Sequence, residues 1–310
     1  MSEPWFIIHN PKSASGRGAV LREKAEALLK AAGVDYRLES TQFGGHASHL
    51  AQAAVENGHR KLIAFGGDGT VNEVVNGIHQ SGLTLASEVI LTQFPTGTGN
   101  DWRRTHGIPT KASEWPSMLI QNSIITQDVG IVRWQESGLP KERCFVNIAG
   151  LGFESYAGLL ANTQKAQGKG GVLSYVAALL KSLRKYQAEE ASINLDHRFY
   201  ESTLLYSAAI GICKYNGGGM KQCPDADPDD GLFDFTRIGQ ISKLDVIRNI
   251  PGLFSGKFVK HPSVAQHRAK RIEVSGPKPI LLEVDGENIG ASPCVFEMSS
   301  LKLRVAVPKR

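Results

Sequence analysis

The chain has 310 residues, of which 41% are hydrophobic and 21% charged, which is typical of a folded protein and excludes an intrinsically disordered one. The formal net charge of +5 is too small to indicate nucleic-acid binding, but it suits a phosphate-bearing ligand or an anionic membrane surface. The four cysteines form no C-x-x-C pair, so we expect reduced thiols in a cytoplasmic protein. We expect neither a signal peptide nor a membrane span.

The first part of the chain alternates between two kinds of segment. Strands are predicted at 5–10, 36–40, 61–65 and 89–94, and helices at 16–32, 46–57 and 71–80. This alternation indicates βαβ units and a parallel sheet that is buried on both faces. We therefore expect residues 1–127 to form a nucleotide-binding α/β domain.

The pattern changes after about residue 127. Short segments with period-two alternation follow one another, separated by turns rich in Gly, Pro, Asp and Asn, and one helix is predicted at about 171–186. Such a pattern is typical of an antiparallel sandwich or barrel. We expect residues 128–310 to form a β-rich domain, with the last residues returning to the first domain. A cleft between the two domains is the expected site.

Three predicted strand ends are followed by loops of glycine and small polar residues, at 10–16, 66–69 and 95–101. Neither the Walker pattern G-x-x-x-x-G-K-S/T nor the Rossmann pattern G-x-G-x-x-G is present. Glycines still let a backbone approach an oxyanion, with φ > 0 where the loop requires it, and the helix that follows attracts anions. Thr70 and Glu73 also fit a capping box, so a plain strand–helix turn is the alternative for any one loop. Three such loops at one sheet edge favour a phosphate site.

Four strings together resemble the catalytic-domain family of diacylglycerol kinases. They are N-P-K-S-A-S-G from Asn10, G-G-D-G-T-V-N-E-V-V-N-G from Gly66, P-T-G-T-G-N-D from Pro95, and V-D-G-E ending at Glu287. That family includes bacterial lipid kinases, eukaryotic diacylglycerol kinases, and sphingosine and ceramide kinases, with NAD kinases as more distant relatives. The resemblance implies an NAD-kinase-like α/β domain with a parallel sheet, and an antiparallel β-sandwich-like second domain. It also implies ATP in the interdomain cleft, Mg²⁺, and phosphorylation of a lipid hydroxyl.

The resemblance also implies a set of nucleotide contacts in the first domain. The loop at 10–16 would hold phosphates, 66–73 would embrace the nucleotide, and a third loop would close the site. The matching residues are Asn10, Pro11, Lys12, Ser13, Ala14, Thr41, Gly66, Gly67, Asp68, Gly69, Thr70, Asn72, Glu73, Thr98 and Asp101. Phosphates repel a carboxylate, so we expect Asp68, the central carboxylate, to hold a cation or a water network.

Two carboxylate motifs lie in the second part of the chain. An Asp-rich run at 217–235 is, taken alone, typical of a solvated turn, but the resemblance implies a structural Mg²⁺ there. Its ligands would be the side chain of Asp230 and the backbone carbonyls of Asp227 and Leu232. The string V-D-G-E is an ordinary hairpin turn if read alone. The resemblance implies that Glu287 deprotonates the acceptor hydroxyl and that Asp285 supports it.

Two further features have weaker implications. His46 and His49 are spaced to share a helix face, but the sequence offers no third ligand, so a surface or partly buried pair is favoured over a zinc site. The basic segment at 163–187 and the segment at 251–262 suit contact with an anionic leaflet. An amphipathic helix that only covers the β-domain core is an equal interpretation of 163–187.

These observations predict an ATP- and Mg²⁺-dependent lipid kinase, acting first of all on diacylglycerol to give phosphatidic acid. The alternatives are another lipid alcohol, such as phosphatidylglycerol or a sphingoid base, or a nucleotide-binding regulator without catalysis. We expect a cytoplasmic protein that associates peripherally with the inner face of the membrane and binds no nucleic acid. The sequence leaves the oligomeric state open, with a dimer among the options.

Overall fold

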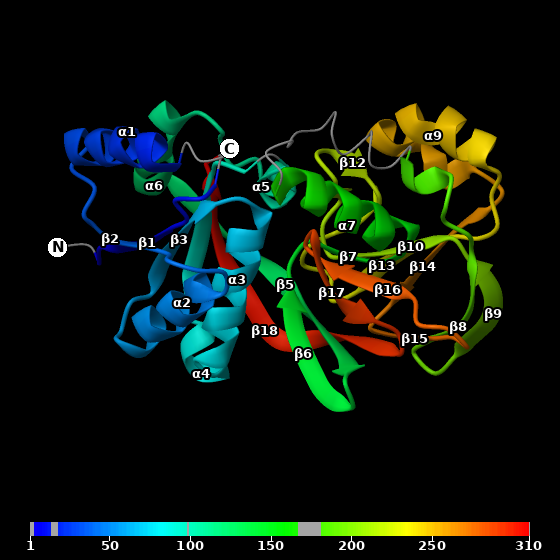
Figure 1. The fold of residues 1–310 in the computed structure, drawn as a ribbon. Coiled ribbons are helices and arrows are strands. Elements are labelled where there is room, and N and C mark those ends of the chain that lie inside the picture. Colours follow the sequence, from blue (N-terminus) through cyan, green and yellow to red (C-terminus); the bar gives the residue numbers. More distant parts are fainter. Residues whose placement is uncertain (1–2, 14–17, 98, 167–180, 310) are drawn as a thin grey trace. The chain divides into compact units, whose positions relative to one another are not determined.

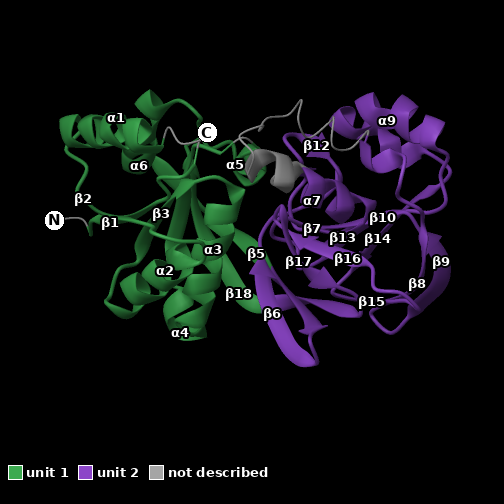
Figure 2. Ribbon diagram, viewed as in Figure 1, with its two compact units in different colours: residues 1–129, 300–310 green, residues 130–299 purple. Residues whose placement is uncertain are grey.

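The computed structural model describes residues 3–13, 18–97, 99–166 and 181–309 (Figure 1). Contacts divide the chain into two compact units, residues 1–129 with 300–310, and residues 130–299 (Figure 2). Ala14, Thr98 and most of the helix predicted at 171–186 lie outside the described residues.

Unit 1 is built on a parallel sheet with the strand order β2-β1-β3-β4-β18. The strands are β1 (Trp5–His9), β2 (Tyr36–Ser40), β3 (Lys61–Gly66), β4 (Ile90–Pro95) and the last residues of β18 (Cys294–Pro308). Near its end β18 runs parallel to β4, with Arg304 opposite Ile90. The last strand of the chain therefore joins the sheet of the first unit.

Helices follow the strands of unit 1 in sequence. They are α1 (Gly18–Ala31), α2 (His46–Glu56), α3 (Asp68–Gln80), α4 (Leu83–Ala86), α5 (Asp101–His106), η2 (Ala112–Glu114) and α6 (Trp115–Ile120). From β1 the chain crosses to β2 at one edge of the sheet, and from β2 it crosses in the opposite direction, past β1, to β3 and then β4. Because βαβ crossovers are right-handed, α1 lies on one face of the sheet, and α2 and α3 on the other (Figure 1).

Two kinds of close packing occur in unit 1, between aromatic rings on one face of the sheet and between two helices at a glycine on the other. Phe94 stacks on Trp115 with ring centroids 4.2 Å apart, and Phe65 meets both rings edge-on. On the other face α2 packs closely against α3, because a Cβ on Gly77 would lie 2.1 Å from the carbonyl oxygen of Ser48. Both contacts hold the strand ends of the sheet in fixed positions.

Unit 2 is an antiparallel sandwich. One sheet has the order β14-β13-β10-β7-β16-β17, and the other contains β9, β8, β15, the first part of β18, β5 and β6. The strands not yet located are β5 (Asn122–Glu136), β6 (Leu139–Phe145), β7 (Ile148–Gly152), β8 (Glu189–Leu195), β9 (Phe199–Leu205), β10 (Ser207–Gly211), β13 (Phe233–Ile238), β14 (Val264–Ala269), β15 (Arg271–Ser275), β16 (Leu281–Val284) and β17 (Glu287–Ala291). Buried residues of both sheets form one core, which includes Phe145, Phe233 and Phe296. The predicted sandwich is confirmed.

Smaller elements complete unit 2. A two-stranded ribbon consists of β11 (Tyr215–Asn216) and β12 (Met220–Lys221). Helix α7 (Phe153–Ala166) follows β7, while α9 (Lys243–Ser255) and the short η3 (Lys257–Lys260) follow β13. The sequence patterns predicted neither α7 nor α9. Among the described residues, no helix is both long and apolar enough to cross a bilayer.

Candidate active site

The carboxyl ends of β1 to β4 lie at one edge of the parallel sheet, because all four strands run in the same direction. Side chains connect the loops that leave this edge. Asn10 Nδ2 donates a hydrogen bond to Thr70 Oγ1 at 3.0 Å, and Thr96 Oγ1 donates one to Ser13 Oγ at 2.8 Å. Thr41 also lies at this edge, with its backbone N–H bonded to the carbonyl of His9 at 2.8 Å. The described parts of the three predicted loops are thus brought together.

Asp68 joins the loop after β3 to the loop after β4. Its Oδ2 accepts a hydrogen bond from the backbone N–H of Asp101 at 3.1 Å, and its Oδ1 accepts one from Trp102 at 3.1 Å. These two amides open α5, so Asp68 caps that helix from a neighbouring loop. Burial raises the pKa of Asp68, and the amide hydrogen bonds oppose this rise. Asp68 is therefore a positioning residue for the loop at 97–102.

Glycines allow the backbones of these two loops to touch. A Cβ on Gly97 would lie 2.6 Å from the Cα of Gly67, and a Cβ on Gly99 would lie 3.2 Å from Asp68 Oδ2. No positive φ occurs at residues 66, 67 or 69, and Gly67 has φ −90°. The glycines of this motif are thus required for close approach between loops, and left-handed backbone plays no part here.

The predicted capping box of Thr70 and Glu73 is wrong. Helix α3 begins at Asp68, two residues before Thr70, and no side chain caps its Gly67 N-cap. Glu73 instead reaches the start of α2, where its two oxygens accept hydrogen bonds from the backbone N–H groups of Gly45 at 2.9 Å and Ala47 at 3.1 Å. The glutamate fixes α2 against α3, which a local sequence pattern does not reveal.

A second carboxylate lies close to Asp68. Asp101 is 3% exposed, and Arg104 Nε contacts its Oδ1 at 3.4 Å. A Cβ on Gly99 would lie 3.1 Å from Asp101 Oδ2, so the carboxylates of Asp68 and Asp101 both lie close to the same glycine. Asn100 precedes α5 with φ 49°, and its side chain bonds both the N–H and the C=O of Gly97.

In unit 2, Asp285 is a buried acceptor in the turn between β16 and β17. Its Oδ2 accepts from the backbone N–H of Val146 at 3.1 Å, and its Oδ1 accepts from Asn147 at 3.0 Å and Ile148 at 3.2 Å. Asp285 and Gly286 have φ of 47° and 85°, the positive values of a tight hairpin turn. Asp285 thus fixes the chain where β6 ends and β7 begins.

Glu287 has a different environment from Asp285. It lies at the start of β17 with 41% of its side chain exposed, and its Oε2 accepts a hydrogen bond from Arg143 at 2.7 Å. Among the described residues, no backbone amide donates a hydrogen bond to the Glu287 carboxylate. The guanidinium orients this carboxylate while leaving it accessible to solvent.

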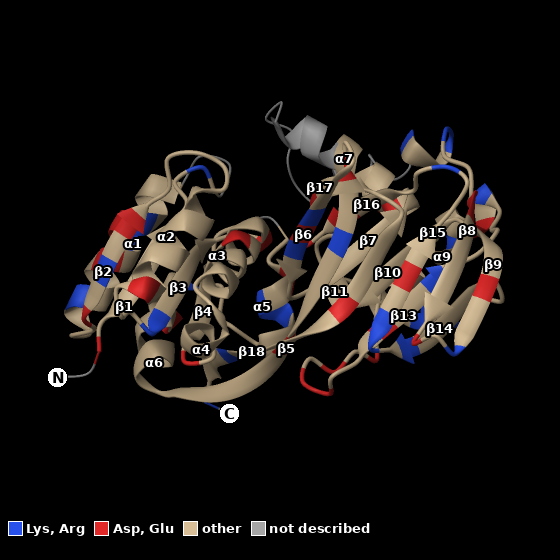
Figure 3. Cartoon of the chain, turned by 90° about the horizontal axis from the view of Figure 1, so that it is seen from below, with Lys and Arg blue, Asp and Glu red and all other residues tan. Residues whose placement is uncertain are grey.

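The Asp-rich loop pairs with an arginine (Asp and Glu positions are coloured red along the cartoon in Figure 3). Asp230 Oδ1 accepts a hydrogen bond from the backbone N–H of Leu232 at 3.0 Å, and its Oδ2 pairs with Arg268. Arg268 also lies 3.5 Å from Asp234 Oδ2. Burial and the neighbouring carboxylates of Asp225 and Asp227 raise the pKa of Asp234 to about 6.

The chemistry of this loop fits a hard cation. Its donors are carboxylate and carbonyl oxygens, and the position beside Asp230 Oδ2 already holds a positive group, the guanidinium of Arg268. Asp234 Oδ2 is buried and has no hydrogen-bond partner among the described residues. No group of three or more His, Cys, Asp or Glu side chains suited to a metal occurs in the described ranges.

Comparisons with known proteins agree on one family. Residues 4–132 match the diacylglycerol kinase catalytic domain, and residues 147–307 match the YegS C-terminal NAD kinase beta sandwich-like domain. A diacylglycerol kinase of Mycobacterium tuberculosis is 30% identical over 304 residues, covering 97% of this chain and 94% of its own. The chain belongs to the diacylglycerol kinase family. A Bacillus subtilis diacylglycerol kinase is 28% identical over 306 residues, covering 98% of this chain and 96% of its own.

A solved structure shares the fold of this lipid kinase. A diacylglycerol kinase from Bacillus anthracis str. Sterne superposes with a TM-score of 0.71 at 22% identity, covering 97% of this chain and 96% of that one. The resemblance, the fold class and the prediction of an enzyme are therefore confirmed. Membership of a kinase family implies ATP as the phosphoryl donor.

The sequence patterns missed one buried pair of carboxyl groups in this kinase. Glu154 is 5% exposed and Glu283 is 2% exposed, and Asn216 Nδ2 donates a hydrogen bond to each of them. Burial and mutual repulsion raise the pKa of Glu154 well above its usual value, while burial raises the pKa of Glu283 to about 6. A Cβ on Gly150 would lie 2.9 Å from the Glu154 carboxyl carbon, so that glycine leaves room for the pair.

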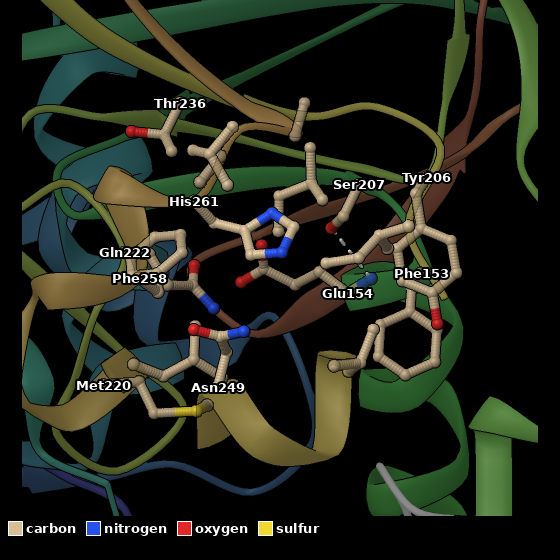
Figure 4. Close-up of a pocket in the computed structure, with 17 residues that line it drawn as sticks. Phe153, Glu154, Tyr206, Ser207, Met220, Gln222, Thr236, Asn249, Phe258 and His261 are labelled. Atoms are coloured by element: carbon tan, nitrogen blue, oxygen red, sulfur yellow. Dashed lines mark hydrogen bonds between the residues drawn. The ribbon is translucent and has the colours of Figure 1, made fainter. Parts of the chain in front are cut away.

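Glu154 also lines a largely apolar cavity of about 80 Å³ within unit 2. The cavity lies between β10, β13 and the start of α7 on one side, and α9 and η3 on the other. Figure 4 shows the rings of Phe153 and Tyr206 side by side, with Gln222 and His261 pointing toward Glu154. Tyr206 Oη and Gln222 Oε1 are buried and have no hydrogen-bond partner among the described residues.

Proposed function

We propose that this lipid kinase transfers the γ-phosphoryl group of ATP to the hydroxyl of diacylglycerol, giving phosphatidic acid and ADP. In this reaction a bond forms between the lipid oxygen and the γ-phosphorus, and the bond from that phosphorus to the bridging oxygen breaks. The hydroxyl proton passes to a carboxylate of the enzyme. Membership of the family supports the reaction class, and the apolar cavity supports the choice of a lipid acceptor.

The cavity is the single observation that carries the lipid assignment. Ligand sites are mostly apolar hollows with a few placed polar groups, as this one is. Its volume is several times the roughly 10–15 Å³ that one water molecule needs. Phe153 and Phe258 supply apolar surface for an acyl chain, while Gln222 Oε1 and Tyr206 Oη are the polar atoms available to a glycerol ester or hydroxyl.

ATP is proposed to bind at the carboxyl edge of the parallel sheet in unit 1. The start of α3 lies there, and the amides and positive dipole end of a helix N-terminus attract phosphate. The residues proposed to contact the nucleotide are Asn10, Pro11, Lys12, Ser13, Ala14, Thr41, Gly66, Gly67, Asp68, Gly69, Thr70, Asn72, Glu73, Thr98 and Asp101. Within this set Asp68 and Glu73 act by holding loops and helices in place.

Mg²⁺ is proposed in two places. One ion would accompany ATP beside Asp68 and Asp101, whose carboxylates both lie close to Gly99 and would balance the charge of the ion. The other is structural and is held by the Asp230 side chain with the carbonyls of Asp227 and Leu232. Bound there, Mg²⁺ would supply the positive charge that Arg268 now supplies to Asp230.

Glu287 is proposed as the general base that takes the hydroxyl proton, and Asp285 as the residue that positions it. A partly exposed carboxylate oriented by Arg143 can accept a proton, which typically contributes roughly 10² to 10⁴ in rate. Asp285 accepts three amide hydrogen bonds and acts through the turn that carries Glu287.

We infer that the enzyme works in the cytoplasm at the inner face of the membrane, since its lipid substrate resides in a bilayer. Phosphatidylglycerol or a sphingoid base is the alternative acceptor, because both offer a hydroxyl on an apolar body. A nucleotide-binding regulator without catalysis is the alternative of a different class, and the presence of Glu287 disfavours it.

Radiolabelled ATP offered with a panel of lipids in micelles, followed by thin-layer separation, tests the proposal. We expect label in the phosphatidic acid spot with diacylglycerol, and roughly 10² to 10⁴ times less label with Glu287→Gln. Label only in another lipid would replace diacylglycerol by that acceptor. ATP binding without a labelled lipid anywhere in the panel would support the regulator.

A further inference from the structure

Helix α9 has two apolar faces, of which only one is covered. Val246, Asn249 and Leu253 line the cavity, spaced so that they share one side of the helix. On the other side Leu244 is 55% exposed, Ile247 46% and Phe254 37%. Apolar side chains on a helix are normally buried against a neighbouring element, yet this helix has no fully buried residue.

Exposed basic residues lie on α9 and on the segments next to it in structure and sequence, and we call them the basic rim. Segment 181–187 adjoins the start of α9, because Lys243 Nζ donates a hydrogen bond to the carbonyl of Arg184 at 3.1 Å. Leu183 is buried in the same cluster that Val246 packs against. Segments 181–187 and 242–260 together contain seven Lys or Arg residues and a single acid, Asp245. The exposed basic residues of these segments are Lys181, Arg184, Lys185, Lys243, Arg248, Lys257 and Lys260.

We propose that α9 and this basic rim form a docking surface for an anionic lipid leaflet, and that α9 is the element across which the lipid substrate reaches the cavity. Leu244, Ile247 and Phe254 enter the acyl boundary, while the basic side chains contact anionic headgroups. This inference rests on the proposed function, because it takes the cavity to be the lipid site.

Charge and position together favour a lipid leaflet as the occupant. Exposed apolar residues accompanied by exposed Lys and Arg residues are typical of interfacial helices on anionic membranes. A second copy of this chain would present the same positive rim, so that the two surfaces would repel each other. The cavity also lies directly behind the docking helix, so a lipid leaving the leaflet would travel the thickness of one helix.

Sedimentation with vesicles of phosphatidylcholine, with and without phosphatidylglycerol, tests the surface without any measurement of activity. Leu244→Ser/Ile247→Ser should lower partitioning onto the anionic vesicles at least about tenfold, since two half-exposed apolar side chains no longer enter the leaflet. Arg248→Glu/Lys257→Glu should lower it by at least about tenfold, because each basic residue near an anionic surface contributes roughly fivefold. Removing phosphatidylglycerol or raising salt should mimic the charge variant.

The matched control is Leu139→Ser/Lys270→Glu, which changes an exposed leucine and an exposed lysine elsewhere in unit 2. It should bind vesicles like the wild type, and all variants should keep the wild-type melting temperature because the changed side chains are exposed. Equal binding by the α9 variants and the wild type, or no binding by the wild type, would overturn the proposal. A concentration-dependent dimer that the α9 variants abolish would also overturn it, in favour of a second copy.

Failure of this inference can be told from failure of the proposed function. If no lipid in the panel is phosphorylated but vesicle binding depends on α9 as stated, the docking surface stands and the catalytic proposal falls. If a short-chain, water-soluble diacylglycerol is phosphorylated but vesicle binding ignores the α9 variants, the catalytic proposal stands and the docking surface falls.

Discussion

Asp285→Asn separates a structural role of Asp285 from a catalytic one. The native carboxylate accepts three backbone N–H bonds, from Val146, Asn147 and Ile148, at 3.0–3.2 Å in a buried turn. Asparagine offers one acceptor oxygen and one NH₂ group, so at least one of these amides loses its acceptor and faces a donor. Asparagine tolerates the φ of 47° at this position, so the backbone adds no further strain.

The cost follows from these contacts. A hydrogen bond to a charged group contributes about 1.5–3 kcal/mol, and the surviving bonds lose their charge assistance. We expect the free energy of unfolding to fall by about 2–4 kcal/mol. At roughly 2–4 °C per kcal/mol for a unit of this size, the melting temperature should fall by roughly 4 to 16 °C.

Thermal and urea unfolding of the wild type, Asp285→Asn and Glu287→Gln give the comparison. Glu287 lies two residues further along and bonds only one partly exposed side chain, Arg143, so Glu287→Gln should melt close to the wild type. If Asp285→Asn also melts within about 1 °C of the wild type while its turnover collapses, the carboxylate acts on the reaction itself and the structural argument is wrong.

The remaining predictions concern four carboxylates. Asp68→Ala should abolish kinase activity and also lower the melting temperature, because two amides at the start of α5 lose their acceptor; undiminished turnover would mean that the loop is only a turn. Glu287→Gln should lower turnover by roughly 10² to 10⁴ at unchanged ATP affinity, and near-normal turnover at saturating lipid would exclude it as the base. Asp230→Asn should remove any rise of melting temperature with Mg²⁺, whereas Arg268→Gln should steepen that rise. A melting temperature that does not change with Mg²⁺ in the wild type and in both variants would exclude a structural cation. Burial raises the folded-state pKa of Glu283 from 4.5 to about 6, so its contribution to stability is complete below about pH 4.5 and is lost as the pH rises through about 6. Glu283→Gln should therefore make the urea midpoint less dependent on pH over this range. A midpoint profile identical to that of the wild type would contradict the pKa shift.

Much of the fold could be predicted because buried strands and amphipathic helices leave local patterns. The strand at 36–40 has the predicted bounds, and the one at 61–65 extends by a single residue to Gly66. Helix α9 was missed because Pro251 and Gly252 stand in its interior, and both residues are typical of turns. A helix packed on a cavity wall tolerates them, which no local pattern reveals.

Of the proposed site, the sequence could supply only the residues that lie in a short local string. The glycine loops and V-D-G-E are such strings, and the resemblance supplied their roles. The pair of Glu154 and Glu283 escaped because its members, and Asn216 between them, come from distant parts of the chain. A single acid in an apolar run, as in L-L-E-V, was the one available signal, and it does not identify a partner.

The hydrogen bonds of the site carboxylates assign their tasks. In three of them both carboxylate oxygens accept hydrogen bonds from backbone amides, at the starts of helices for Asp68 and Glu73 and at a strand junction for Asp285. A carboxylate bonded in this way holds the backbone, and protonating it would break the contacts that place the loops. Glu287 bonds a single flexible guanidinium and remains partly exposed, so it can take a proton without disturbing the chain around it. Of these four carboxylates, Glu287 has the environment that suits the base proposed for the reaction, whereas the other three each hold backbone segments of their own unit in place.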